Sequence, residues 1–186
     1  MLGMTKNEVL LSDRIILKES LKQNCSLSIV DKLTERIIAF LLITTSESLN
    51  LNPSKVSSEN LSENHLIIGR MLNYFEDAYI KVLDVESKCS YNSMMSVHPS
   101  YRNFGFACQL IRKSEHVAVD LGCRYVIGAF SSSLYAQKVH EKLGYKSCVK
   151  LNYANYVDPI TGKKPFKIPC PPHTQISSLS RDQPIR

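Results

Sequence analysis

The chain has 186 residues, the length of one ordinary domain, with a hydrophobic fraction of 44% and a mean hydropathy of -0.13. This composition supplies one buried core and excludes wholesale disorder. The longest apolar run, Ile37 to Ile43, is too short to span a membrane, and the first residues lack the features of an export signal. We therefore expect a soluble, cytoplasmic protein with no membrane partner.

The net charge of +6 comes from one region of the chain. Residues 138–186 carry nine basic and three acidic side chains, whereas the residues before them are balanced. Excess positive charge can indicate a nucleic-acid partner, but this region has no recognisable binding motif with interleaved aromatic residues. We expect no nucleic-acid partner.

Six cysteines lie 15 to 64 residues apart, with no CxxC pair and no nearby histidine at ligand spacing. We expect reduced, mostly buried thiols and no metal site, with a disulfide or zinc framework as the alternative. The cysteines are Cys25, Cys89, Cys108, Cys123, Cys148 and Cys170.

The first half of the chain predicts two strands and a helix. A short alternating segment over 26–31 and a β-branched apolar run over 36–45 are typical of strands. Residues 46–64, rich in Ser, Asn and Glu, predict an exposed loop. Apolar residues at helical spacing over 63–83 predict an amphipathic helix.

The second half alternates strands and helices before it returns to strand. We expect a strand over 91–97, a helix over 107–121 that ends at Gly122, a strand over 124–130 and a helix over 134–143 that ends at Gly144. Strands over 145–156 and 165–168 follow, and residues 169–186 are expected to be irregular.

This order of elements predicts an α/β fold. Strand, helix and strand in succession indicate a crossover with parallel pairing, within a mixed sheet that has antiparallel strands at both ends. We expect a single domain over residues 1–178 and a flexible tail over 179–186.

The segment after the strand at 91–97 is where chemistry is expected. A helix that begins directly after a strand and a short loop presents unpaired amides and its positive dipole end to an anion. Gly105 lets a ligand approach the backbone closely, and Arg102 adds charge, so a pyrophosphate would fit here. An ordinary strand-to-helix loop is the alternative.

These residues resemble the acetyl-coenzyme A (acetyl-CoA) loop of the GNAT superfamily of N-acetyltransferases. The pattern is Arg102-x-x-Gly105-x-Ala107, followed by a helix, a strand and the sequence EKLGY at 141–145. The resemblance narrows to the insect-type arylalkylamine N-acetyltransferases through residues 20–38, 153–156 and 172–173, and it covers roughly residues 5–178.

The resemblance implies the GNAT fold, acetyl-CoA as co-substrate and no metal. A backbone amide at the end of the strand would meet the oxyanion, and the loop would bind the coenzyme. The residues implied are Met95, Ser96, Val97, Arg102, Asn103, Phe104, Gly105, Phe106 and Ala107. Asn103 and Phe104 replace the family's usual glycine and polar residue, so we expect a stiffer loop and a lower coenzyme affinity.

For catalysis, the resemblance implies direct attack of a primary amine on the thioester in a ternary complex. Glu8 lies in a remnant of the family's D-E-P-L motif at 7–10 and would be the base that deprotonates the amine. On this interpretation the family's first strand and most of its first helix have no counterpart before Met1. The alternative for Glu8 is an exposed acidic residue near a chain end.

The leaving thiolate needs a proton donor, and the resemblance assigns this role to Tyr135. Ser132 matches the first of two serines in the insect-type enzymes, whereas Ala136 stands at the second position. The alternatives are half-buried packing for Tyr135 and a helix cap for Ser132.

The expected function is that of a monomeric N-acetyltransferase with a small primary amine, in particular an arylalkylamine, as its substrate and partner. The alternative is a truncated, non-catalytic GNAT-like domain that binds CoA or a protein partner.

Overall fold

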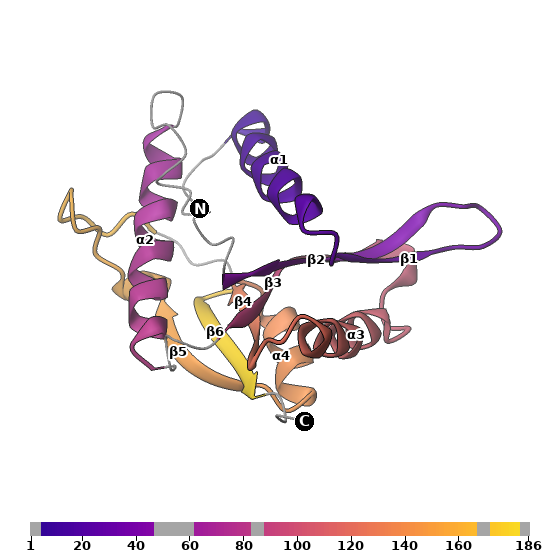
Figure 1. The fold of residues 1–186 in the computed structure, drawn as a ribbon. Coiled ribbons are helices and arrows are strands. Elements are labelled where there is room, and N and C mark those ends of the chain that lie inside the picture. The colour runs from indigo at the N-terminus through magenta and orange to yellow at the C-terminus, as the bar shows by residue number, and fades with distance from the viewer. Residues whose placement is uncertain (1–4, 47–61, 83–87, 167–171, 183–186) are drawn as a thin grey trace.

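The computed structural model describes residues 5–46, 62–82, 88–166 and 172–182. Its centre is a six-stranded sheet with the strand order β1-β2-β3-β4-β6-β5 (Figure 1). The strands are β1 (Leu27–Val30), β2 (Ile37–Thr45), β3 (Cys89–Val97), β4 (Tyr125–Ser131), β5 (Lys146–Asn152) and β6 (Gln175–Asp182). The helices are α1 (Lys6–Lys22), α2 (Glu63–Ile80), α3 (Phe106–Asp120) and α4 (Leu134–Lys142), with the 3-10 turns η4 (Pro99–Tyr101) and η5 (Tyr153–Asn155).

The central pair of strands, β3 and β4, is parallel, and each of the other neighbouring pairs in the described sheet is antiparallel. Helix α3 connects the two parallel strands, because strands in parallel register cannot be joined by a tight hairpin. The predicted α/β class, with its central crossover and flanking antiparallel strands, is confirmed.

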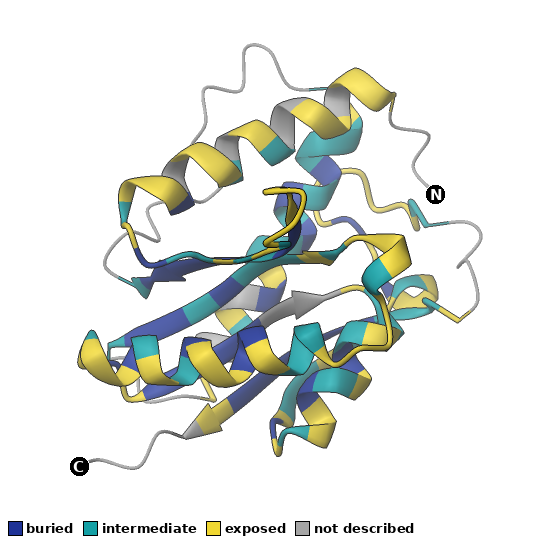
Figure 2. Ribbon diagram, turned by 90° about the vertical axis from the view of Figure 1, so that its right-hand side faces the viewer, coloured by how far each residue is buried: buried dark blue, intermediate teal, exposed yellow. Residues whose placement is uncertain are grey.

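The helices cover both faces of the sheet (Figure 1). Helices α3 and α4 lie on one face, where Ile111 of α3 packs with Val126 and Leu179 of the sheet. Helices α1 and α2 lie on the other face, where Phe75 of α2 packs with Ile176. Most of β2 is buried (Figure 2), which explains its long apolar run.

Most elements expected between residues 26 and 143 are present. The predicted strands and helices correspond in chain order to β1, β2, α2, β3, α3, β4 and α4. Gly122 and Gly144 follow α3 and α4 with φ angles of 71° and 89°, as expected of helix stops. The loop predicted over 46–64 lies largely outside the described residues.

Helix α1 was not predicted. The sequence suggested no regular element ahead of residue 26, whereas the structure has a helix of 17 residues that packs against β2. Its apolar residues are spread around the helix, so that Val9, Leu10, Leu17 and Leu21 are all exposed. Without a narrow apolar stripe, the periodic signal of an amphipathic helix is weak.

The expectation of an irregular carboxyl-terminal segment was wrong for residues 175–182. They form β6, so residues 179–182 of the expected flexible tail belong to a strand between β4 and β5. Ser177, Ser178 and Ser180 are buried in this strand. Serine is a poor signal for a buried strand, and ladder pairing along both edges overrides that local preference.

The strand predicted over 145–156 is also shorter than expected. Strand β5 ends at Asn152, whose side-chain oxygen accepts a hydrogen bond from the amide of Ala154 and caps the turn η5. Residues 165–166 are irregular instead of strand, and 167–168 lie outside the described residues.

Candidate active site

The parallel strands β3 and β4 pair only near their amino ends. The ladder joins Cys89–Tyr91 to Tyr125–Ile127, whereas β3 continues to Val97 and β4 to Ser131. Beyond this ladder, the edge of β3 that faces β4 has no strand partner in the described sheet. Backbone amides and carbonyls along that edge need other partners, which a ligand can supply.

Three of the predicted coenzyme contacts lie in this open part of β3. On the other edge of the strand, Met95 and Val97 pair with β2. Their side chains pack with residues of α3, while Ser96 between them is exposed. The main chain of Met95 and Val97 is therefore the part of these two residues that is left for a ligand between β3 and β4.

The amino end of α3 follows the carboxyl end of β3 after a short loop. Gly105 is the N-cap residue, has a φ of 81° and makes no side-chain capping bond. The amides of Phe106 and Ala107 in the first helical turn lack an intrahelical acceptor, so the helix end is suited to an anion. The left-handed backbone explains why glycine stands at position 105.

The loop residues before Gly105 also have well-defined conformations. The Nε of Arg102 donates a hydrogen bond of 3.2 Å to the carbonyl of Val97. Asn103 has a φ of 69°, a conformation that asparagine adopts more readily than most residues. Phe104 is 69% exposed, and its ring centroid lies 6.3 Å from that of Phe106. The left-handed backbone at position 103 is thus one that asparagine tolerates and that glycine would adopt without strain.

A contact that the sequence did not indicate holds this loop against the β1–β2 hairpin. The hydroxyl of Tyr101 donates a hydrogen bond of 2.6 Å to Oδ2 of Asp31. The same carboxylate accepts hydrogen bonds from the amides of Leu33 and Thr34. These bonds lower the pKa of Asp31, that from Tyr101 most of all, and the carboxylate raises the pKa of Tyr101. No local pattern links two residues 70 positions apart.

Tyr135 lies in the first turn of α4, close to the carboxyl end of β4. Its side chain is 66% exposed, and its ring centroid is 5.4 Å from that of His173 in an edge-to-face arrangement. Nδ1 of His173 accepts a hydrogen bond of 3.1 Å from the amide of Leu134. The residue predicted as proton donor is therefore accessible, which does not fit the alternative of half-buried packing.

Ser132 precedes α4 and is exposed. The N-cap of this helix is Ser133, which makes no side-chain capping bond, so the alternative that Ser132 is a helix cap was wrong. The Ser132 hydroxyl instead forms a hydrogen bond with Tyr153 that partly offsets the rise in the pKa of Tyr153 caused by burial.

Glu8 is the third residue of α1, so it is part of a 17-residue helix and not of an irregular end. Helix α1 lies across the sheet from α3 and α4 (Figure 1). The predicted base and the predicted coenzyme loop are therefore on opposite faces of the sheet.

An ion pair and an aromatic cluster, both missed in the sequence, connect α2 to the segment after η5. Asp158 is fully buried and accepts hydrogen bonds of 2.6 and 2.9 Å from Nε and Nη2 of Arg70. Next to it, the ring of Tyr156 lies 6.5 Å from Tyr74 and 5.8 Å from Phe166. This aromatic surface is on the same face of the sheet as α1 and α2.

His140 is the most buried of the described histidines, at 4% exposed. Its Nδ1 lies 2.9 Å from the carbonyl of Ala136, and Nε2 has no hydrogen-bond partner within the described residues. Burial lowers the pKa of His140. Its imidazole covers Gly128 of β4, where any β-carbon would overlap with the ring. His140 is therefore a packing residue of the core.

The described part of the chain contains no group of three or more His, Cys, Asp or Glu side chains that could hold a metal ion. Its cysteines are free, and Cys25, Cys89 and Cys123 are buried, as expected; Cys170 lies outside the described residues. Across the same described ranges, none of the helices has the length and apolar character needed to cross a membrane.

Comparison with known proteins places this fold and loop in a family. Residues 7–145 match the model of the acetyltransferase (GNAT) family, and this span covers most of the chain. The chain therefore belongs to the GNAT family of acetyltransferases. A search of curated protein sequences finds no match.

Three of the solved structures that share this fold come from insects. An arylalkylamine N-acetyltransferase 2 from Aedes aegypti has a TM-score of 0.74 at 21% identity, over 94% of this chain and 80% of that one. A mosquito arylalkylamine N-acetyltransferase-like 5b has a TM-score of 0.77 at 20% identity, over 96% of this chain and 82% of that one. A polyamine N-acetyltransferase from Drosophila melanogaster that forms N-acetylagmatine has a TM-score of 0.76 at 18% identity, over 91% of this chain and 79% of that one.

Proposed function

We propose that this protein transfers an acetyl group from acetyl-CoA to a small primary amine by direct attack in a ternary complex. The observation that carries the proposal is the uncapped amino end of α3, which follows Gly105 and lies beside the open edge of β3. An anion-binding helix end next to unpaired strand backbone suits a ligand that has a pyrophosphate and an amide-rich chain, and acetyl-CoA has both.

The chain's residues fit the parts of this coenzyme. The amides of Gly105, Phe106 and Ala107 face the pyrophosphate, and the Arg102 guanidinium adds positive charge beside it. Asn103 and Phe104 complete the loop. The open backbone of β3 at Met95, Ser96 and Val97 hydrogen-bonds the chain that carries the thioester.

The two substrates approach from opposite faces of the sheet. Glu8, on the α1 face, takes a proton from the ammonium group, directly or through water, because only the neutral amine is a nucleophile. The amine nitrogen then forms a bond to the thioester carbonyl carbon, and the positively charged nitrogen that results loses its second proton to solvent before the intermediate collapses. Backbone amides between Met95 and Val97 stabilise the negative charge that develops on the carbonyl oxygen.

The reaction ends when the carbon–sulfur bond breaks. The electron pair stays on sulfur, which receives a proton from the hydroxyl of Tyr135 at the start of α4. Tyr135 is accessible to solvent and recovers its proton there, and Glu8 releases its proton to solvent. Ser132 lies close in sequence to Tyr135 and keeps the amino end of α4 polar.

An arylalkylamine is the substrate class that this proposal favours. The aromatic cluster of Tyr74, Tyr156 and Phe166 lies on the α1 face, from which the amine approaches. Tyr156 is buried, and the exposed ring of Tyr74 is the part of the cluster against which an aromatic substrate would pack. Insect structures of the same fold carry names that refer to arylalkylamines and to polyamines, so agmatine is the competing class.

Thiol release from acetyl-CoA in the presence of tryptamine, dopamine or agmatine tests the proposal. We expect release with the two aromatic amines. Glu8→Gln and Tyr135→Phe should each lower kcat by about 10²-fold and leave the Kd for CoA unchanged. Gly105→Val should weaken CoA binding, because valine cannot adopt a φ of 81° without strain.

The competing function is a non-catalytic domain that binds CoA or a protein partner, since Arg102 and Gly105 serve both functions. Binding of CoA without thiol release for any amine would favour this alternative. Absence of CoA binding would overturn both.

A further inference from the structure

A buried polar side chain lies where the ladder between β3 and β4 ends. The last ladder pair is Tyr91 and Ile127, so the next residues, Asn92 and Gly128, are the first beyond it. Asn92 is 4% exposed, and neither its Oδ1 nor its Nδ2 has a hydrogen-bond partner within the described residues. Buried polar groups without a protein partner are rare and commonly indicate a bound water or ligand.

Asn92 projects to the face of the sheet that α3 and α4 cover. It pairs with Ile43 of β2, and partners in an antiparallel pair project to the same face. Ile43 packs with Leu110 of α3, which identifies that face. His140 of α4 covers Gly128 there. Because neighbouring strands lie about 5 Å apart, the side chains of Asn92 and His140 are neighbours at the end of the ladder.

Packing on the sheet accounts for the carbon atoms of His140 but not for its Nε2. Nδ1 lies 2.9 Å from the carbonyl oxygen of Ala136, which can only accept, so Nδ1 carries the proton. Burial lowers the pKa of His140, which favours the neutral ring. Nε2 is then an acceptor, and it has no partner in the part of the chain that the structure describes.

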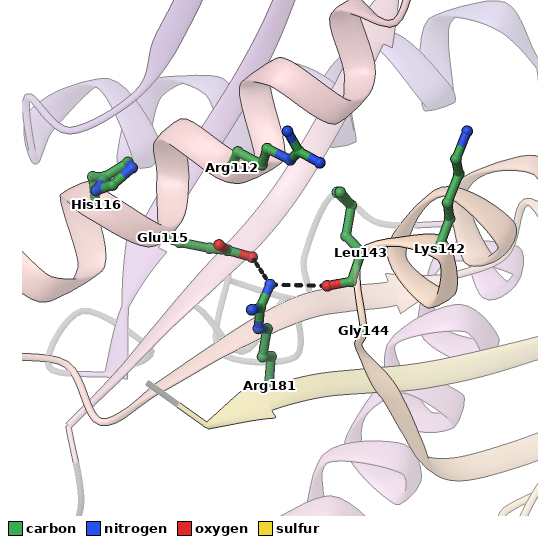
Figure 3. Close-up of a pocket in the computed structure, with 7 residues that line it drawn as sticks. All are labelled: Arg112, Glu115, His116, Lys142, Leu143, Gly144 and Arg181. Carbon is green, nitrogen blue, oxygen red and sulfur yellow. Dashed lines mark hydrogen bonds and ion pairs between the residues drawn. The ribbon is translucent and has the colours of Figure 1, made fainter. Parts of the chain in front are cut away.

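The end of α4 that carries His140 is tied to α3 and β6. Nη1 of Arg181 donates hydrogen bonds of 2.8 Å to the carbonyl of Leu143, directly after α4, and of 2.9 Å to the carboxylate of Glu115 in α3 (Figure 3). The ring of His140 also meets that of Tyr145 edge to face, with the centroids 4.9 Å apart. Its Nε2 therefore has a fixed position beside β4.

One water can bridge these two side chains. It would accept a hydrogen bond from Nδ2 of Asn92 and donate one to Nε2 of His140. Oδ1 of Asn92 remains as a further acceptor at the same place. The end of the ladder is therefore polar, although apolar residues of α3 and β2 surround it.

The proposed coenzyme position directs the acyl group toward this polar end. The pyrophosphate is placed at Gly105, and the thioester oxygen meets amides between Met95 and Val97. The coenzyme chain thus runs along β3 from its carboxyl end toward Asn92. Any atoms of the acyl group beyond the thioester point toward the end of the ladder.

We propose that Asn92 and His140, bridged by one water, restrict the acyl donor to acetyl-CoA. The inference rests on the proposed function and specifies which donors the same site accepts. A longer acyl chain must displace the water and leave buried polar atoms of both residues without partners. That penalty outweighs the gain from burying a few methylene groups.

Calorimetric titration of the full chain with acetyl-CoA and with butyryl-CoA, without an amine, tests the inference. We expect the unmodified protein to bind acetyl-CoA about tenfold more tightly. Asn92→Ala removes both amide atoms, and His140→Phe keeps a ring on the sheet but lacks Nε2. Each variant should reduce the preference to about threefold or less. An unchanged preference in both variants would overturn the inference, with thermal unfolding as the check that each is folded.

Ser90→Ala is the matched control. Ser90 is two residues before Asn92, so it projects to the same face, and its hydroxyl is also buried without a partner within the described residues. It pairs with Val126 inside the ladder, where no acyl chain reaches. The preference for acetyl-CoA should therefore persist. If Ser90→Ala reduces it as much as Asn92→Ala does, the effect is a general loosening of the core and the inference is wrong.

The remaining outcomes separate this inference from the proposed function. Equal binding of acetyl-CoA and butyryl-CoA by the unmodified protein overturns the inference alone. Failure of acetyl-CoA, butyryl-CoA and free CoA to bind overturns the proposed function and the inference together. A crystal structure of the protein should show a water within hydrogen-bond distance of both side chains. A direct hydrogen bond between Asn92 and His140 would overturn the inference, because the two groups would then satisfy each other.

Discussion

The hydroxyl of Tyr101 and the carboxylate of Asp31, 2.6 Å apart, join the candidate coenzyme loop to the β1–β2 hairpin. Tyr101 ends the turn η4, directly before Arg102, and Asp31 directly follows β1. The bond fixes one side of a loop that otherwise depends on its own backbone conformation. A site that binds through backbone amides needs such support, because its donors cannot adjust independently.

Tyr101→Phe should therefore weaken CoA binding by about threefold without unfolding the protein, since only a single, partly buried hydrogen bond is lost. Calorimetric titration with CoA measures the effect. In a double-mutant cycle, Asp31→Ala should add little to Tyr101→Phe. Fully additive losses of affinity would show that the two residues act separately.

Glycines 105 and 69 provide a contrast between two backbone conformations. Gly105 has a φ of 81°, so Gly105→Ala should lower the free energy of unfolding by about 1 kcal/mol and also weaken CoA binding. Gly69 lies in α2, and an added β-carbon there meets no atom within 4 Å. Gly69→Ala should raise the free energy of unfolding by up to about 1 kcal/mol. Urea unfolding measures both, and equal effects would contradict the assignment of strain to position 105.

The Arg70–Asp158 pair should stabilise the fold more than its neighbour Arg70–Glu63. Asp158 is fully buried, so Asp158→Asn should lower the free energy of unfolding by about 2 kcal/mol, because it weakens two charged hydrogen bonds. Glu63 lies 2.8 Å from the same guanidinium, but its side chain is 60% exposed. Glu63→Gln should lower the free energy of unfolding by less than about 0.5 kcal/mol. Similar losses in the two variants, measured by urea unfolding, would contradict this ranking.

The same pair should make stability depend on pH. The hydrogen bonds from Arg70 are the main cause that lowers the pKa of Asp158 to about 2. A carboxyl group whose pKa is lower in the folded state stabilises it fully above the unfolded pKa of about 3.9, and this contribution is lost as the pH falls toward 2. Urea midpoints between pH 5 and 2 should fall less for Asp158→Asn than for the unmodified chain. Parallel curves would show that Asp158 is not the group responsible.

Gly128 and His140 should be coupled. A β-carbon at position 128 overlaps with the His140 ring, so Gly128→Ala should lower the free energy of unfolding by about 1 to 3 kcal/mol. The shorter side chain of His140→Ala removes that overlap, so the double variant should be more stable than the sum of the two single effects predicts. Thermal and urea unfolding measure the coupling, and simple additivity would contradict it.

Local signals in the sequence were sufficient for the central crossover. Three kinds of local signal restrict the backbone where they occur. They are the apolar β-branched run of β2, the proline after β3 and the glycines after α3 and α4. The loop pattern from Arg102 to Ala107 was likewise visible, because an anion site at a helix end needs only a strand, a glycine and a helix in succession. Those features correctly predicted the fold class and the family.

Helix α1 and strand β6 were decided by tertiary packing. The apolar residues of α1 form no narrow stripe, and β6 contains three buried serines. The local sequence of neither element strongly prefers its secondary structure. Contacts with the sheet stabilise both elements, since α1 packs on β2 and β6 pairs along both of its edges.

The sequence by itself determined the class of fold, the family and the position of the candidate coenzyme loop, because these depend on residues that are neighbours in the chain. The tertiary structure alone decided which distant residues meet. Tyr101 meets Asp31 beside the loop, and Arg70 meets Asp158 on the other face of the sheet. Such pairs depend on side chains brought together from separate elements, and the local pattern at either partner carries no information about the other.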